Sequence, residues 1–158
     1  MKGIAYYNSP VGDILIESKD EKIACVSFVD TRKHEQYLTP AIEQCLTELD
    51  EYFFHGRKFF SVEILLTGTT FQNRVWTELL NIPYGRTISY MELAVQIGDI
   101  NSIRAVGVAN NQNPIAIIVP CHRVIGKNGE LVGYEGGLKR KEWLLMHEGA
   151  FSEQLKLF

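Results

Sequence analysis

The sequence has few cysteines, no long apolar run and no apolar leader. Its 158 residues include only three cysteines, an odd number that is too small for a disulfide scaffold. The longest uninterrupted apolar run covers residues 115–119, whereas a membrane-spanning helix needs ~20 apolar residues. The first residues indicate a polar-flanked strand and lack the core of a signal peptide. We therefore expect a cytoplasmic protein with reduced thiols and no membrane partner.

Neither sign of charge dominates, since the net charge is −3 at pH 7. Residues 1–68 carry 7 Lys and Arg against 11 Asp and Glu, whereas residues 69–158 carry 9 against 8. A strongly basic nucleic-acid binder is thereby excluded, and any contact with DNA would depend on a local patch in the second half. Apolar residues make up 46% and charged residues 22%, which is typical of a globular protein and excludes a disordered chain.

The first half predicts a small antiparallel sheet followed by a helix. Three strands are indicated by alternating and β-branched residues separated by turn-forming residues, over 4–7, 12–17 and 22–28. A helix is predicted to begin at Pro40, with Thr39 as its N-cap, and to end before Gly56. Residues 59–66 predict a further strand.

After residue 67 the apolar periodicity becomes helical. A first helix carries the apolar face of residues 71–80, and Ser89 followed by Glu92 forms a capping box for a second helix that Gly98 ends. A third helix is predicted to begin near Asn101, and together the second and third form a helix-turn-helix. Residues 115–119 predict a buried strand, and residues 139–147 predict a last helix.

Cys121 is the residue whose surroundings indicate chemistry. Cys25 and Cys45 each lie on an apolar face of a predicted element, as inert buried thiols do. Cys121 instead follows the predicted end of a strand, adjoins His122 and Arg123 and precedes a glycine-rich segment, so we expect an exposed thiol among cations. A nucleophilic cysteine needs a nearby base or cation, and His122 could act as that base through a water molecule. A structural thiol and a protease-like Cys-His pair remain alternatives at this point.

A longer set of motifs resembles the O6-alkylguanine-DNA alkyltransferases, also called methylated-DNA–protein-cysteine methyltransferases. The resemblance is strong over about residues 67–149, and over residues 1–66 it extends to the layout of the elements alone. The Pro-Cys-His-Arg string in this spacing is highly specific. The matching segments are 70–72, 75–76, 82–85, 88–90, 104–107, 113–114, 117–124, 133–138, 141–145 and Glu148.

The resemblance implies an α/β protein of two domains. Residues 1–66 would form a small ribonuclease-H-like unit of antiparallel sheet and helix, and residues 67–158 a mostly helical, winged-helix-like domain with the helix-turn-helix. The implied reaction is the irreversible, stoichiometric transfer of an alkyl group from O6 of guanine in double-stranded DNA to Cys121. The resemblance implies no cofactor, and we expect a monomer. Cys25, Cys45 and His34 do not match the zinc-ligand spacing of some relatives, so we predict no metal.

The resemblance also assigns roles to the residues around Cys121. His122 would activate the cysteine through a water molecule, backed by Glu148, which is the nucleophile, base and orienting-group logic of a catalytic triad. Asn113 would support the turn that carries the cysteine. Tyr90 would donate a proton or hydrogen bond to the departing guanine.

Further residues are expected to contact the substrate. Arg104 matches the arginine that fills the space left by a flipped base, and Ala105 and Gly107 would let the same helix approach the minor groove. Tyr134 would close the pocket over the base. The substrate and DNA contacts expected beside the cysteine are Arg123 and Val124, with carbonyls near Cys121 and Val124 binding the amine of guanine.

Two other functions fit parts of the same pattern. A helix-turn-helix regulator or lesion sensor with a structural cysteine would bind DNA without covalent change, and a cysteine hydrolase would turn over an ester or peptide. Glu135 departs from the resemblance, because it places a carboxylate where relatives often carry a small residue at the rim of the pocket. This carboxylate is expected to bear on whether the pocket accepts bulky alkyl groups.

Overall fold

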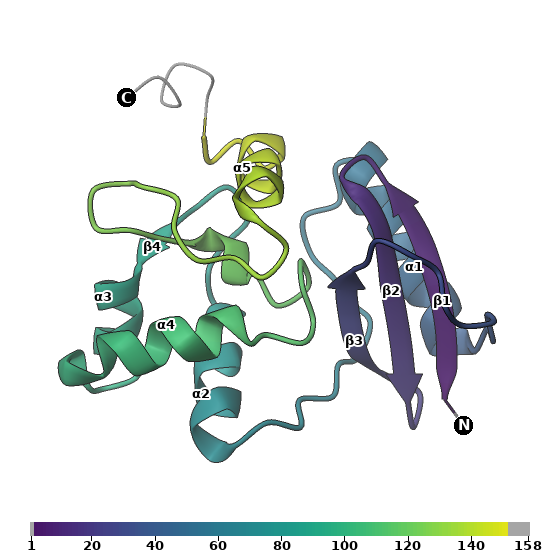
Figure 1. Ribbon diagram of the computed structural model, residues 1–158, viewed down its shortest axis with the longest axis horizontal. Coiled ribbons are helices and arrows are strands. Elements are labelled where there is room, and N and C mark those ends of the chain that lie inside the picture. The colour runs from purple at the N-terminus through teal and green to yellow at the C-terminus, as the bar shows by residue number, and fades with distance from the viewer. Residues whose placement is uncertain (1, 152–158) are drawn as a thin grey trace. The chain divides into compact units, whose positions relative to one another are not determined.

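The computed structural model describes residues 2–151, which fall into two compact units (Figure 1). Unit 1 comprises the chain up to Thr67 together with Pro114–Ile118, and unit 2 comprises Gly68–Asn113 and the chain from Val119 onward. The division differs from the expected domains 1–66 and 67–158 because the segment Pro114–Ile118 groups with unit 1, where Ile115 forms a bridge to Val26. Positions 1 and 152–158 of those expected domains lie outside the described residues.

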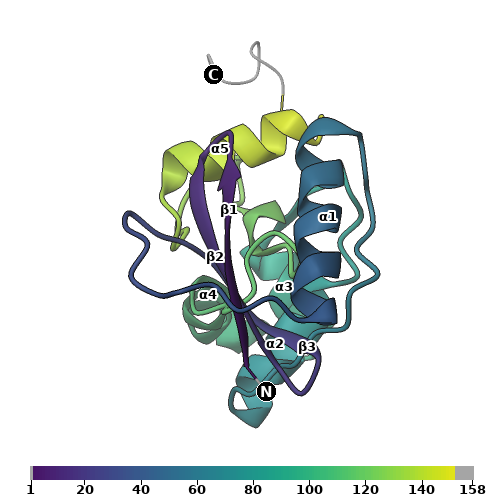
Figure 2. The ribbon, with the colours of Figure 1, turned by 90° about the vertical axis from the view of Figure 1, so that its right-hand side faces the viewer.

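Unit 1 contains a three-stranded antiparallel sheet with one helix against a face, as the sequence predicted (Figures 1 and 2). The strands follow chain order as β1 (Gly3–Ser9), β2 (Gly12–Lys19) and β3 (Lys22–Phe28). Helix α1 (Pro40–Phe54) begins where predicted, because the Thr39 side chain accepts a hydrogen bond from the Ile42 N–H and Pro40 occupies its first position. The apolar face of α1 is buried against the sheet, and this packing makes the core of unit 1.

Both expected strands outside the meander are wrong. Residues 59–66 and 115–119 each make one isolated parallel bridge, Ile23 with Ile64 and Val26 with Ile115. Both bridges protect the free edge of β3, which would otherwise expose unpaired backbone groups. After Ile115 the chain turns, and Ile117 adopts a positive φ of 71° although its side chain is buried. The run is apolar because the turn is buried, and a run of this length does not distinguish a strand from a buried turn.

Unit 2 is built mainly from helices. It contains α2 (Thr70–Leu79), α3 (Tyr90–Gln96), α4 (Ile103–Asn111) and α5 (Leu138–His147), with the short 3₁₀ helices η1 (Ile100–Ser102) and η2 (Cys121–Arg123). A two-residue parallel pair joins β4 (Ile88–Ser89) to β5 (Val124–Ile125). Helices α2, α3 and α4 pack against one another, while α5 packs on η2 (Figure 1). Between residues 2 and 151, no helix is long and apolar enough to cross a membrane.

The predicted capping box fixes where α3 begins, and the predicted Gly98 turn ends it; Asn101, the expected start of the next helix, lies in η1, and α4 begins two residues later at Ile103. The Ser89 hydroxyl accepts the Glu92 N–H at 3.0 Å, and the Glu92 carboxylate accepts the Ser89 N–H at 3.4 Å. Gly98 follows α3 with a φ of +92°, and the Asp99 side chain then accepts the Asn101 N–H at 2.9 Å. These turns bring α4 back against α3, in the arrangement predicted for the helix-turn-helix. They also set the position of Tyr90, the first residue of α3.

Loss of the Ser89 cap should destabilise the protein. Ser89→Ala leaves the first N–H groups of α3 without their side-chain acceptor, and we expect a loss of about 1 kcal/mol in the free energy of unfolding. Ser89→Thr keeps the hydroxyl and should remain within a few tenths of the unmodified value. Urea denaturation followed by circular dichroism measures both. Equal losses in the two variants would contradict the capping argument.

Candidate active site

Cys121 begins the turn η2 inside unit 2. Cys121 is only 4% exposed, so the expectation of an exposed thiol is wrong. Burial raises the pKa of this thiol to about 11, while a hydrogen bond from Asn113 and the charge of Lys141 act in the opposite direction. The resting group is therefore a neutral thiol at pH 7, and ionising it requires a base.

His122, the next residue of this turn, contacts Glu148. His122 Nε2 lies 2.7 Å from Glu148 Oε2, and both side chains are buried. Burial lowers the pKa of His122 despite the carboxylate beside it, and the charges of Arg123 and Lys141 act in the same direction as burial. The other ring nitrogen, Nδ1, is buried without a hydrogen-bond partner among the described residues. A neutral imidazole with a free lone pair therefore lies next to the cysteine in the chain.

Arg123 does not occupy the position expected of a residue that contacts DNA. Its guanidinium is buried and donates to Glu148 through Nε at 2.7 Å and Nη2 at 3.1 Å, and through Nη1 to the Ile82 carbonyl at 2.7 Å. It also lies over the ring of Tyr84, 5.7 Å from its centroid. Arg123 is buried because Glu148, a buried carboxylate at the end of α5, needs a cation as its partner.

Two asparagines hold the Cys121 turn to α4. Asn113 Nδ2 donates to the Val119 carbonyl at 2.7 Å, so it lies where the resemblance placed it. Asn110 Nδ2 donates to the Cys121 carbonyl at 3.3 Å, and sequence reasoning did not single this residue out. A signal was present, because Asn110 is a polar residue one helical turn after Val106 on the buried face of α4.

Lys141 is the second residue that sequence reasoning missed. Its side chain is fully buried, and Nζ donates to the carbonyls of Val124 at 2.6 Å, Val132 at 2.8 Å and Gly133 at 3.4 Å. Burial lowers the pKa of this lysine to about 8, and the Cys121 thiolate acts in the opposite direction. Lys141 therefore fixes the ends of the glycine-rich loop and places a positive charge near the cysteine. Its helical face is that of Leu144 and Leu145, which was the available signal.

The two tyrosines lie around the same loop. Tyr90 Oη donates to the Val132 carbonyl at 2.9 Å, and burial raises the pKa of its phenol. Tyr134 is buried, and the pKa of its phenol is raised well above the usual value, mainly by burial and secondarily by the charge of Cys121. Both phenols are therefore neutral hydrogen-bond donors. The Val124 carbonyl accepts a hydrogen bond from Lys141 Nζ, and the Cys121 carbonyl accepts two, from Asn110 Nδ2 and from the Val124 N–H.

The exposed face of α4 carries the residues expected to contact DNA. Arg104 and Ala105 are exposed and line a groove of about 580 Å³. Gly107 is half-buried, and a Cβ there would lie 3.8 Å from the Tyr90 ring, so it faces α3 as well as the surface. Ala109 also lines this groove, but it is 2% exposed and its carbonyl accepts the Trp76 indole N–H at 2.8 Å. Ala109 therefore contributes little to the outer surface of α4. The remaining lining residues are Phe71, Gln72, Asn101, Ser102, Val108 and Gln112.

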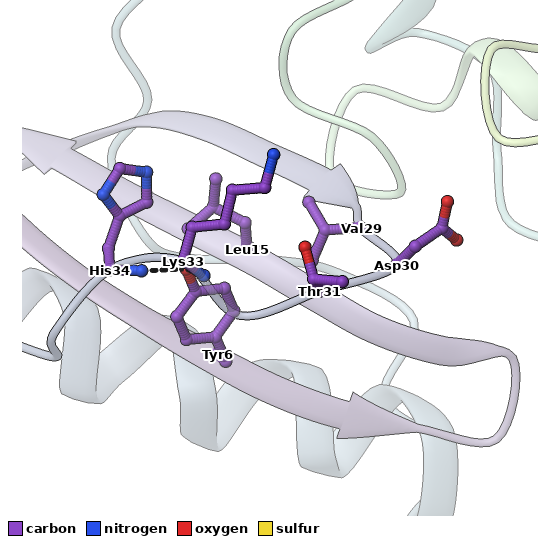
Figure 3. Close-up of a pocket in the computed structure, with 7 residues that line it drawn as sticks. All are labelled: Tyr6, Leu15, Val29, Asp30, Thr31, Lys33 and His34. Atoms are coloured by element: carbon purple, nitrogen blue, oxygen red, sulfur yellow. Dashed lines mark hydrogen bonds between the residues drawn. The ribbon is translucent and has the colours of Figure 1, made fainter.

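Unit 1 contains a smaller pocket of about 250 Å³, which includes none of the predicted site residues (Figure 3). Its base is Tyr6, whose Oη accepts the backbone N–H groups of Lys33 at 3.1 Å and His34 at 3.0 Å. These bonds hold the segment after β3 over the sheet. His34 is exposed and lies at the rim of this pocket.

The raised pKa of Cys121 gives a pH dependence that can be measured. The thiolate is the reactive form, so the logarithm of the rate of Cys121 alkylation by iodoacetamide should keep rising with unit slope to about pH 10. An unperturbed cysteine, with a pKa near 8.5, should level off above about pH 9. Peptide mass mapping separates Cys121 from Cys25 and Cys45, and a short cysteine peptide is the control. A plateau at the pH found for that peptide would contradict the burial argument.

Comparison with known proteins supports one family across both units. A family model described as "6-O-methylguanine DNA methyltransferase, ribonuclease-like domain" matches residues 4–66. A second, described as "6-O-methylguanine DNA methyltransferase, DNA binding domain", matches residues 70–150. These two segments together cover most of the chain.

Individual relatives give the same result over nearly their whole length. The methylated-DNA–protein-cysteine methyltransferase of Methanosarcina acetivorans is 45% identical over 152 residues, which cover 92% of this chain and 97% of the relative. The crystal structure of the Mycobacterium tuberculosis O6-methylguanine methyltransferase has a TM-score of 0.85 and 41% identity, covering 100% and 99% of the two chains. A structure of the M. tuberculosis protein OGT in complex with DNA has a TM-score of 0.84 and 44% identity, covering 92% and 91%. The chain therefore belongs to the 6-O-methylguanine DNA methyltransferase family.

Proposed function

We propose that this protein repairs DNA by transferring an alkyl group irreversibly from O6 of guanine to Cys121. The observation that carries the proposal is that the Cys121 thiol, the His122 imidazole and the Glu148 carboxylate are all buried, with His122 Nε2 at 2.7 Å from Glu148 Oε2. A thiol with a pKa near 11 needs a base, and the adjacent imidazole is neutral with an unpartnered nitrogen. Its relatives are named for this activity.

The proposed step is a displacement at the alkyl carbon. Cys121 Sγ forms the new carbon–sulfur bond as the bond between that carbon and guanine O6 breaks. The thiol proton passes through a water molecule to His122 Nδ1, and the electron pair of the broken bond stays on guanine. Guanine takes a proton from Tyr90 to become the normal base, and the proton on His122 returns to water, from which Tyr90 is reprotonated. The thioether that remains has no ionisable proton, so each chain reacts once.

Burial of Cys121 supports a requirement for base flipping. A base stacked in a duplex cannot reach a thiol that is 4% exposed, so the alkylated guanine must rotate out of the helix into the protein. We assign Arg104 to the space that it leaves, because Arg104 is exposed on α4 beside the groove that Ala105 also lines. The small residue Ala105, with Gly107 behind it, suits the close approach of α4 to the minor groove.

The tyrosines supply the donors that the leaving guanine needs. Tyr90 is a neutral phenol whose hydrogen bond to the Val132 carbonyl would be exchanged for one to the departing base. Tyr134, on the same loop, would cover the base, and the carbonyls of Cys121 and Val124 would accept hydrogen bonds from its amine. Asn113 keeps the Cys121 turn joined to α4, so that binding of DNA and presentation of the thiol are linked.

The partner of this reaction is double-stranded DNA that contains O6-alkylguanine. We propose that a single copy of the chain acts as a monomer without a cofactor. We also propose a cytoplasmic location, because a reactive free thiol is maintained in a reducing compartment.

The central test is the intact mass of the protein after reaction with duplex DNA carrying O6-methylguanine. We expect a gain of one methylene mass, located on Cys121 by peptide mapping, that saturates at one methyl group per chain when the DNA is in excess. Cys121→Ala should gain no mass but should still bind the alkylated duplex. Cys45→Ala, which removes another buried thiol, is the matched control and should react normally.

Three outcomes would count against the proposal or a part of it. Binding of alkylated DNA with no added mass would point to a lesion sensor, and label on Cys25 or Cys45 would move the nucleophile elsewhere. More than one methyl group removed per chain would overturn the single-use mechanism.

Arg104 should matter only when the base must leave a duplex. Because unstacking costs a few kcal/mol, Arg104→Ala should slow repair of duplex O6-methylguanine by about tenfold or more. Its reaction with free O6-benzylguanine should stay within about twofold of the unmodified rate. Arg86→Ala removes another exposed arginine of unit 2 and serves as the charge control. Equal losses on both substrates would contradict this role, and single-turnover kinetics decide between the outcomes.

A further inference from the structure

Arg123 and its neighbour His122 contact the same carboxylate, that of Glu148. The two Arg123 nitrogens Nε and Nη2 contact the two different oxygens of the carboxylate, at 2.7 Å and 3.1 Å. Oε2 is shared, since His122 Nε2 lies 2.7 Å from it. Arg123 is further held by the Ile82 carbonyl and the Tyr84 ring, so each of its three guanidinium nitrogens donates a hydrogen bond.

This geometry determines which nitrogen of His122 carries the proton. Burial alone would favour a neutral Glu148, but Arg123 and His122 outweigh it and hold the pKa of Glu148 well below its usual range. An ionised carboxylate can only accept hydrogen bonds, so the proton in the 2.7 Å contact belongs to His122 Nε2. A neutral imidazole has one N–H, so Nδ1 carries the lone pair. Nδ1 is the buried nitrogen that has no partner among residues 2–151.

The same geometry explains why His122 stays neutral beside an anion. Among residues 2–151, the charged groups that act on its pKa are Lys141 on α5, Glu148 at the end of α5 and Arg123 on its own turn, where the neutral thiol of Cys121 precedes it in the chain. Arg123 cancels the charge of Glu148 at hydrogen-bond distance, and Lys141 adds a further positive charge. Without Arg123, the negative charge of Glu148 would act on His122 with no guanidinium to offset it. A second proton would then bind to the imidazole at Nδ1. The protonated Nδ1 could no longer accept the proton of the Cys121 thiol.

We propose that Arg123 is a positioning residue for alkyl transfer, which keeps His122 neutral and leaves Nδ1 free to take the Cys121 proton. The proposal deepens the function proposed above and names the residue on which the protonation state of the base depends. It replaces the DNA contact expected of Arg123 with a role inside the protein. The role requires both a positive charge and the two-pronged geometry of a guanidinium.

The first test observes His122 directly and does not depend on activity. In the unmodified protein, ¹⁵N NMR of labelled histidine, assigned by loss of signals in His122→Gln, should show Nε2 protonated and Nδ1 unprotonated between about pH 6 and pH 8. In Arg123→Gln, Nδ1 should become protonated within this range. In the double variant Arg123→Gln/Glu148→Gln, where neither charge remains, burial should make His122 neutral again. Arg86→Gln, which removes an exposed arginine of the same unit, should change nothing.

The second test follows the pH dependence of single-turnover methyl transfer. Because protonated His122 cannot act as a base, Arg123→Gln should lose about tenfold or more at pH 6 relative to the unmodified protein, and the difference should narrow towards pH 9. Arg123→Lys keeps the charge, so its rate should show the pH dependence of the unmodified protein at a uniformly lower level. A loss in Arg123→Gln that is the same at every pH would reduce Arg123 to a structural role and overturn the proposal.

Failure of the variants to fold would still leave the proposal open to refutation. Protonation of Nδ1 in the unmodified protein, or protonation that persists in the double variant, would overturn it without any kinetic measurement. If the NMR result is as expected but no methyl group reaches Cys121, the proposed alkyl transfer fails while the control of His122 by Arg123 stands.

Discussion

One buried carboxylate holds the reactive part of unit 2 together. Glu148 lies at the end of α5, where the helix dipole disfavours a negative charge, yet it is paired with Arg123 and contacts His122. Through Arg123 the same charge reaches the carbonyl of Ile82 in the segment after α2. A buried ion pair adds little net stability over an apolar cluster, but removal of one partner costs about 3–5 kcal/mol. The pair is therefore best understood as a constraint on position, because any conformation that separates these segments leaves a buried charge uncompensated.

The turn that carries Cys121 needs such constraints because its backbone is irregular. Between residues 116 and 121 the chain makes tight bonds from Ile118 N to Ala116 O and from Cys121 N to Val119 O, both at 2.8 Å. The carbonyls of Val119 and Cys121 accept hydrogen bonds from the side-chain amides of Asn113 and Asn110. The carbonyls of the following loop accept from the buried ammonium of Lys141. Buried backbone groups have to be paired, so a loop that passes through the interior requires polar side chains around it. The polar residues of this core, Asn110, Asn113 and Lys141, are therefore specified by the loop.

Local signals in the sequence predicted the elements, while partners distant in the chain decided the rest. Caps such as Thr39 and Ser89 act within three residues, and both helices begin where these caps predicted. Residues 115–119 have the composition of a strand, but whether they pair depends on the edge of β3, which lies far away in the chain. The motif brought His122 and Glu148 to attention, and they do lie in contact. Arg123 and Lys141 were misplaced or missed because charged residues are rarely buried, and only the fold shows which carboxylate or carbonyls surround them.

The buried thiol reconciles reactivity with protection. With a pKa near 11, only roughly one Cys121 in 10⁴ is ionised at neutral pH, and oxidants and adventitious alkylating agents react with the thiolate. For a protein proposed to react once, an inert resting thiol preserves the capacity to react. The same burial strengthens electrostatic interactions, so a neutral His122 and the charge of Lys141 can assist ionisation when an alkylated base fills the site and completes the exclusion of water. Reactivity then depends on the substrate being in place, and the arrangement of Arg123, Glu148 and His122 keeps the base ready for that moment.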